Sequence, residues 1–182
     1  FWFSETPEVP GSKSWNTACT RLCSWARFEM KSTGQTFYFY NLHLDHKSQP
    51  ARDHSVELLS ERIHAREKKD EPVIVTGDFN AGEKGAPIRF MKGELARTTD
   101  SKAKVVSPKL VDTFRVLHPD AKDVATAAGF KGGRVGEKID YIFAPADVRV
   151  LETEIIYDQK NGRYPSDHYP VMATLRLPKK GS

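Results

Sequence analysis

Short segments with β character recur along the chain and are separated by helical patterns, and this alternation restricts the fold more than any other feature. Residues 36–44 are dense in aromatic side chains. Residues 72–76 (PVIVT) form a short apolar run typical of a buried strand. Further strands are expected at residues 20–30, 138–144, 148–157 and 169–177.

Helical patterns lie between some of these strands. Ser48 can cap a helix that carries Pro50 in its first turn, and Val56, Leu59 and Ile63 then recur at helical spacing. Shorter helices are expected at 85–93 and 108–118, and loops at 94–108 and 129–137. The mixture predicts one α/β domain, with the sheet inside and the helices outside.

The charge of the chain only mildly favours a polyanionic partner. The net charge is +4, and Lys131, Arg134 and Lys138 flank the glycine-rich loop at 129–137, but ordinary surface lysines explain this equally well. The sequence has no recognition-helix or zinc-finger pattern, so nothing beyond the net charge supports a non-catalytic nucleic-acid-binding protein. No apolar run is long enough to span a bilayer. We expect a soluble monomer, either cytoplasmic or exported.

The sharpest candidate site is Thr76-Gly77-Asp78-Phe79-Asn80, where an apolar strand ends. In an extended chain Asp78 and Asn80 lie on the same side. The carboxylate can accept a proton from water, and the amide can hold that water or a phosphate oxygen. The alternative is a simple turn, because Gly, Asp and Asn are all turn formers.

The aromatic strand also ends in polar residues. Asn41 and His43 share one face of the strand, and Leu42 and Leu44 share the other. If the leucines face the core, the polar pair faces away from it. A single histidine at a strand end is more often structural than catalytic, so this motif is weak alone.

Two more polar groups lie near the C-terminal strands. In Ser166-Asp167-His168, Asp167 is an oxygen ligand of the kind that Mg²⁺ accepts, although a solvated loop would look the same. Asp140 interrupts an apolar strand, so it either lies on an exposed edge or needs a buried partner such as an imidazole. Together, the four strand ends supply the groups needed for metal-assisted attack on phosphorus.

The motifs NLHLDH, GDFN, KIDYIF and SDHYPV, in that order, resemble the endonuclease/exonuclease/phosphatase superfamily, and FWFSETP and CTRLCSWARF resemble a bacterial branch of it. The resemblance covers nearly the whole chain. It implies a deoxyribonuclease-I-like fold, a four-layered α-β-β-α sandwich. It also implies a Mg²⁺-dependent phosphoester hydrolase, with Mn²⁺ as a possible substitute, that acts as a nuclease, another phosphodiesterase or a phosphatase. The substrate would be a nucleic acid, a phospholipid or a sugar phosphate.

The resemblance further implies catalytic roles. Asp78 would orient and deprotonate the attacking water, and Asn80 would hold the water and the phosphate. His43 and His168 would contact the scissile phosphate and stabilise its developing charge. Asp140 would hold His168 in place.

Three other residues would complete the site, but the principal metal ligand of the family has no counterpart in this sequence. Asp167 would lie at or near the Mg²⁺, and Arg21 and Asn41 would line the cleft. The family begins with a strand carrying an Asn, followed by a Glu that is the principal metal ligand, and neither Glu5 nor Glu29 has that context. We therefore expect residues 1–182 to form the C-terminal portion of a single domain. The alternative is a non-catalytic or inactive form of the fold that binds a phosphate-containing ligand.

Substrate specificity is not encoded in these motifs, which recognise only the phosphate. The loops at 94–108 and 129–137 are the candidate specificity loops. Trp15, Trp25 and Tyr164 could stack on a base, but packing against the core is the favoured expectation.

Overall fold

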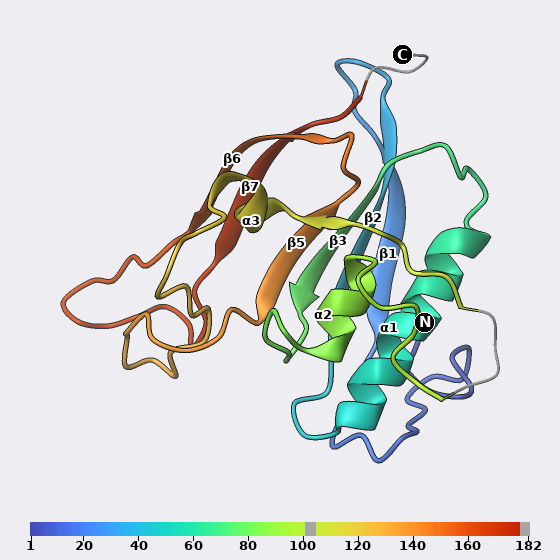
Figure 1. Cartoon of the computed structure of the whole chain (residues 1–182), viewed down its shortest axis with the longest axis horizontal. Coiled ribbons are helices and arrows are strands. Elements are labelled where there is room, and N and C mark those ends of the chain that lie inside the picture. The colour runs from blue at the N-terminus through green and yellow to red at the C-terminus, as the bar shows by residue number, and fades with distance from the viewer. Residues whose placement is uncertain (101–104, 179–182) are drawn as a thin grey trace.

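The computed structural model describes residues 1–100 and 105–178, so part of the expected loop at 94–108 lies outside the described residues. A five-stranded sheet has the order β1-β2-β3-β5-β4, and β6 and β7 form a separate two-stranded sheet (Figure 1). The strands are β1 (Cys23–Glu29), β2 (Thr36–His43), β3 (Val73–Asp78), β4 (Val111–Asp112), β5 (Asp140–Ala144), β6 (Arg149–Ile155) and β7 (Val171–Arg176). The helices are α1 (Gln49–Ala65), α2 (Ala86–Met91) and α3 (Thr113–Leu117).

Each expected strand segment contains a strand, with two differences in the elements around them. β3 continues beyond the apolar run as far as Asp78, because Gly77 and Asp78 pair with β2 on one side and β5 on the other. The helix expected at 108–118 begins only at Thr113, because Val111 and Asp112 pair with β5 instead.

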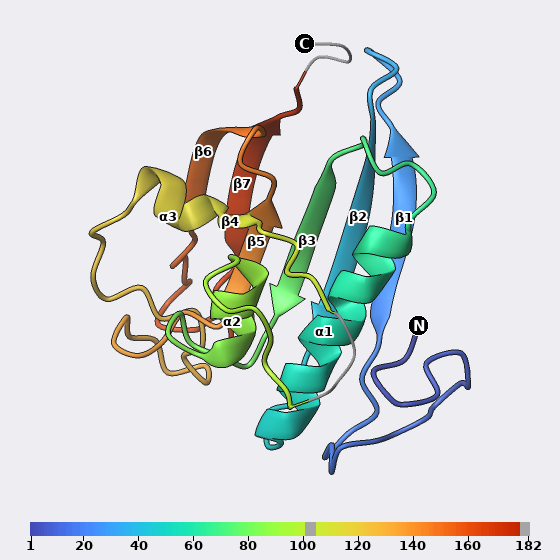
Figure 2. The ribbon, with the colours of Figure 1, turned by 45° about the vertical axis from the view of Figure 1, so that its right-hand side comes forward.

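Helices α1 and α2 cover one face of the five-stranded sheet (Figure 2). Helix α1 begins as its sequence predicts: the Ser48 side chain accepts a hydrogen bond from the Ala51 N–H at 3.2 Å, and a proline occupies the first turn. The helix connects β2 to β3, which are parallel and therefore need such a crossover. Its buried side chain Leu59 packs in one cluster with Val75 and Phe143 of the sheet.

The opposite face of the sheet carries the β6–β7 hairpin. Phe39 and Ile74, which alternate with the helix-facing residues, pack with Leu175 of the hairpin. Near the β1 edge this face is more open, and the Phe28 side chain is 49% exposed. The described residues thus form a mixed α/β fold with helices on one face of the sheet and a hairpin on the other, and the complete four-layered sandwich stays a prediction.

The described helices include none that combines the length and the apolar character required to cross a membrane.

The aromatic residues considered for stacking lie in different settings. Trp15 stacks on His54 with ring centroids 4.7 Å apart, and Tyr164 packs against Tyr169 at 5.6 Å. Trp25 contacts the tyrosines of β2 but is 53% exposed, so the packing expected for it is incomplete.

Candidate active site

Three candidate residues form a row across neighbouring strands. His43 at the end of β2 is the register partner of Asp78 at the end of β3, and Asp78 is in turn the partner of Asp140 at the start of β5. Partners in a ladder point to the same face of a sheet. Leu42 and Leu44 are buried on the helix side, as expected, so the row lies on the face opposite the helices.

The side chains of this row make two close pairs. His43 Nε2 lies 3.2 Å from Asp78 Oδ2, and His168 Nδ1 lies 2.8 Å from Asp140 Oδ2. His168 comes from the segment before β7, where it forms a bridge with Ala127. Asp140 and His168 line an open cleft of about 440 Å³, whereas the His43–Asp78 pair lies outside its lining. Four segments that are distant in the sequence therefore meet at one place.

Asn80 fixes the orientation of the neighbouring carboxylate. Its backbone N–H donates to Asp78 Oδ1 at 2.7 Å, and its Nδ2 donates to Asp78 Oδ2 at 3.3 Å and to the Leu44 carbonyl at 2.9 Å. Asn80 has a φ of 46°, which an Asn tolerates better than most residues. The turn is therefore present, and it orients the Asp78 carboxylate of the candidate site.

Burial and neighbouring charges shift the pKa values of these groups in different directions. Burial raises the pKa of Asp78, and the nearby Asp140 carboxylate adds to this against the Asn80 hydrogen bond. Burial lowers the pKa of His43, and the Arg21 charge lowers it further, although Asp78 opposes both.

The second imidazole is shifted the other way. Burial alone would lower the pKa of His168, but its hydrogen bond to Asp140 and the charge of that carboxylate raise it above the ordinary value. The environment therefore favours a neutral His43 and a protonated His168.

Three side chains could together hold a metal ion. Among the described residues, the ligand atoms of Asp78, Asp140 and His168 lie within 4.8 Å of one another. Asp167 is outside this group: its side chain is exposed and its Oδ1 accepts a hydrogen bond from Ser166 Oγ at 3.3 Å. The metal-binding role expected for Asp167 stays a prediction.

The expected cleft residues Arg21 and Asn41 lie beside the row. Asn41 Oδ1 accepts a hydrogen bond from Thr76 Oγ1 at 2.9 Å, and Asn41 and Thr76 are register partners in the same ladder as His43 and Asp78. Arg21 Nη2 lies 3.1 Å from His46 Nδ1, and the positive charge of Arg21 lowers the pKa of His43. Their roles toward a substrate stay predictions.

Asp45 organises the backbone next to His43, a role that no motif in the sequence indicated. It is buried and accepts hydrogen bonds from Thr17 Oγ1 at 2.7 Å, from the backbone of residues 18–19 and from the Lys47 and Ser48 N–H groups at 2.9 and 2.7 Å. Burial alone would raise the pKa of Asp45, but these hydrogen bonds lower it far below its usual range. The only sequence signal is an Asp two residues before a donor N–H, as in an Asx turn.

Thr126 is a second residue that the sequence did not reveal. Its buried Oγ1 accepts hydrogen bonds from the Ile139 and Asp140 N–H groups at 2.9 and 3.1 Å, and its carbonyl accepts one from the Tyr169 N–H at 2.7 Å. One side chain and its backbone thereby tie the strand of Asp140 to the segment of His168. No local pattern around Thr126 indicates this.

The position of Lys138 corrects the expectation that the basic residues around the glycine-rich loop are all available to a polyanionic partner. Lys138 is only 1% exposed, and its Nζ lies 2.9 Å from Asp112 Oδ2 and 3.3 Å from the Tyr141 ring centroid. Burial lowers the pKa of Lys138 although Asp112 opposes the shift. Lys138 is therefore a core residue and cannot contact a polyanion, whereas Lys131 is exposed.

Comparisons with known proteins agree with this geometry. The profile of the Endonuclease/Exonuclease/phosphatase family matches residues 8–168. A mannosyl-6-phosphatase from Bacteroides thetaiotaomicron, Bt3783, is 31% identical with a TM-score of 0.77, and the match covers 97% of this chain and 64% of that one. An endonuclease/exonuclease/phosphatase protein from Bacteroides vulgatus is 29% identical with a TM-score of 0.76, covering 98% of this chain and 64% of that one.

A viral protein is also similar in sequence. Protein L388 of Acanthamoeba polyphaga mimivirus is 34% identical over 86 residues, which is 46% of this chain and 31% of the viral protein. The chain thus spans about 64% of the length of the two bacterial structures, and the match covers less of the viral relative.

Proposed function

The chain belongs to the endonuclease/exonuclease/phosphatase family, and from that premise we propose that it is a metal-dependent phosphoester hydrolase whose Asp78 activates the attacking water. The observation that carries this proposal is the pairing of His43 with Asp78 and of Asp140 with His168 on one face of the sheet. A chance arrangement is a poor explanation, because the paired residues come from separate segments.

Asp78 is suited to take a proton from water. Its two oxygens are oriented by Asn80, and its raised pKa makes the carboxylate a stronger base than an exposed aspartate. In the proposed reaction, the water oxygen forms a bond to phosphorus while the bond from phosphorus to the ester oxygen breaks. Asn80, still able to accept a hydrogen bond through its Oδ1, would help to hold the water.

The two histidines would stabilise the charge that develops on the phosphate. His168, whose Nδ1 is occupied by Asp140, can donate from its Nε2 to a phosphate oxygen. His43 is 54% exposed beside Asp78 and can contact the same group. Asn41 and Arg21 would bind the substrate at the edge of the cleft.

The donor set fits a divalent cation. Asp78 and Asp140 supply carboxylate oxygens, which Mg²⁺ prefers, and Mn²⁺ tolerates the neighbouring imidazole as well. We propose that Asp140, together with Asp167, holds Mg²⁺ or Mn²⁺ beside Asp78, which then accepts the proton from water. When bound, the ion would neutralise charge on the phosphate oxygens.

Among the substrate classes open to this family, we favour a sugar phosphate. The similarity to a mannosyl-6-phosphatase at 31% identity supports a phosphomonoester whose leaving group is a sugar. A phosphodiester substrate such as DNA is the alternative within the same chemistry.

The test is a substrate panel with Mg²⁺ or Mn²⁺ on the naturally encoded protein and its Asp78→Asn and His168→Ala variants. The panel contains mannose 6-phosphate, p-nitrophenyl phosphate and bis(p-nitrophenyl) phosphate. We expect each variant to lower kcat roughly 10²- to 10⁴-fold, because each removes a group that acts in the transition state. EDTA should abolish turnover, and added Mg²⁺ or Mn²⁺ should restore it.

The control is Asp147→Asn, an exposed carboxylate in the turn between β5 and β6, which should retain normal kcat. Near-normal turnover by both active-site variants would contradict the proposed mechanism. If the unmodified protein hydrolyses none of the three esters with either metal, the phosphate-binding, non-catalytic alternative is favoured instead.

A further inference from the structure

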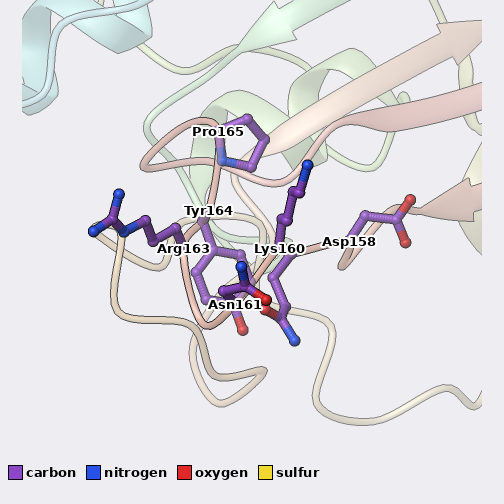
Figure 3. A pocket seen from close by; sticks show the side chains of 7 residues that line it. Asp158, Lys160, Asn161, Arg163, Tyr164 and Pro165 are labelled. Atoms are coloured by element: carbon purple, nitrogen blue, oxygen red, sulfur yellow. The ribbon is translucent and has the colours of Figure 1, made fainter.

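A hollow of about 810 Å³ lies in the loop between β6 and β7, the loop that leads to His168. It is lined by residues 158–161 and 163–165 (Figure 3). Pro165 lines this hollow, and the next residue, Ser166, lines the cleft that contains Asp140 and His168. The two hollows therefore meet at consecutive residues of the chain.

The tip of the loop is a defined hairpin turn. The Lys160 N–H donates to the Arg163 carbonyl at 3.0 Å, and the Arg163 N–H donates back to the Lys160 carbonyl at 3.0 Å. Asn161 and Gly162 between them have φ values of 53° and 73°, as a type I′ turn requires. The side-chain oxygen of Gln159 also accepts a hydrogen bond from the Gly162 N–H. The side chains at this tip are thus presented from an ordered backbone.

The base of the loop is fixed by three tyrosines. The Tyr169 ring lies 4.6 Å from that of Tyr157 and 5.6 Å from that of Tyr164, and both pairs are edge-on. Arg134 of the glycine-rich loop lies over the Tyr157 ring at 4.1 Å, and Tyr169 OH donates to the Gly133 carbonyl at 2.9 Å. Because Tyr169 follows His168 in the chain, the cluster packs beside the segment that carries this imidazole.

The chemistry of the lining is mixed rather than uniformly basic. Lys160 and Arg163, which extend in different directions in Figure 3, offer only donors, whereas Asp158 offers only acceptors and Asn161 offers both. A nucleic-acid backbone would favour positive charge alone, and Asp158 opposes it. The lining offers a single aromatic ring for stacking on a base, that of Tyr164, which also packs edge-on against Tyr169. A set of donors and acceptors suits hydroxyl groups, each of which both donates and accepts.

We propose that this hollow binds the sugar that leaves when the phosphate ester is cut, an inference that rests on the proposed function. Arg163 and Asn161 hydrogen-bond to its hydroxyl groups, and Tyr164 and Pro165 form the wall nearest the cleft. The loop then sets substrate preference, while the row of His43, Asp78 and Asp140 acts on any phosphate ester. A substrate without a sugar gains nothing from the loop.

The test compares kcat/KM for mannose 6-phosphate with kcat/KM for p-nitrophenyl phosphate, which has no hydroxyl groups on its leaving group. The variants are Arg163→Ala and Asn161→Gly, the second of which removes the amide but keeps the positive φ of the turn. Losing a hydrogen bond to the sugar should lower the ratio of the two kcat/KM values roughly 10-fold in each variant. Arg149→Ala is the matched control, because Arg149 is an exposed arginine at the other end of β6.

The outcomes separate the two proposals. An unchanged ratio in both loop variants overturns the sugar subsite even if the enzyme is an active phosphatase. An Arg163-dependent preference for adenosine 5′-monophosphate over ribose 5-phosphate would show that the loop recognises the base rather than the sugar, and it also overturns the subsite, in favour of a nucleotide. If neither ester is hydrolysed, the proposed function fails, and calorimetric titration with mannose 6-phosphate decides the subsite alone: binding weakened by Arg163→Ala supports it, and no binding refutes it.

Discussion

At the scale of single residues, the site depends on carboxylates whose partners are fixed. Asp140 accepts from His168, Asp78 accepts from Asn80, and the buried Asp45 gathers donors from residues 17–19 and 47–48. Asp45 is the clearest case, because the groups that donate hydrogen bonds to it lie outside the proposed chemistry, although Arg21 Nε also lies 3.9 Å from its Oδ2. Its hydrogen bonds hold the segment that follows His43, and with it the start of α1.

We expect Asp45→Asn to lower the free energy of unfolding by roughly 3 kcal/mol at pH 7, because several buried donors lose a charged acceptor. The pKa of Asp45 is lowered in the folded state, and its unfolded value is about 3.9. The stabilisation is therefore complete above that value and is lost as the pH falls from about 4 toward the folded pKa. Urea unfolding at pH 7 and pH 3 measures the difference between the variant and the unmodified protein, which should shrink in acid.

Asp70→Asn, at an exposed turn, serves as the control and should change stability little at either pH. A loss from Asp45→Asn that is equally large at pH 3 would contradict the role given to the ionised carboxylate.

At the scale of elements, β3 is the strand on which the site depends, and Gly77 is its weakest point for substitution. Gly77 has a φ of 140°, and a Cβ at this position would lie 1.9 Å from the Leu42 carbonyl oxygen of β2. The close approach brings β2 and β3 together one residue before the His43–Asp78 pair. Only glycine satisfies both the backbone conformation and the contact.

Gly77→Ala should therefore cost roughly 3 kcal/mol or more of stability, or prevent folding. Gly34→Ala is a matched control, because Gly34 also has a positive φ, 67°, but a Cβ added there would meet nothing within 4 Å. That control should cost only about 1 to 2 kcal/mol. Thermal unfolding of the two variants compares them, and equal losses would show that the Leu42 contact is unimportant.

At the scale of the whole molecule, Lys138 and Asp112 join the sheet to α3. Asp112 caps α3 by accepting a hydrogen bond from the Phe114 N–H at 3.1 Å, and its other oxygen accepts the Lys138 ammonium. Both side chains are almost completely buried. A buried ion pair contributes little net stability, but removing one partner leaves an uncompensated charge.

Lys138→Met should lower the free energy of unfolding by roughly 3–5 kcal/mol. Adding Asp112→Asn should recover much of this loss, because Asn removes the unpaired charge and is still a good N-cap. Denaturant unfolding of the single and double variants tests this. A double variant no more stable than Lys138→Met would mean that packing, rather than charge, explains the effect.

The sequence was informative where structure is local and uninformative where it is not. The apolar run before Asp78 and the alternation of Leu42 with His43 predicted the strands and the face of the site, since both patterns depend only on neighbouring residues. The burial of Lys138 and the bridging role of Thr126 could not be predicted, because their partners are brought together only by tertiary packing. Asn161 and the glycine after it are a local hairpin signal, which could have joined the two expected strands on either side of them.

Under the proposed function, the row of register partners also makes enzymatic activity a reporter of correct folding. Side chains alternate between faces along a strand, so a slip of β3 by one residue would turn Asp78 toward the helices and away from His43. A misregistered chain that kept a compact core and ordinary helix content would still lack Asp78, the proposed base, beside His43. Turnover per molecule would then distinguish natively paired chains from compact, misregistered chains that have the same spectroscopic signal as the native fold.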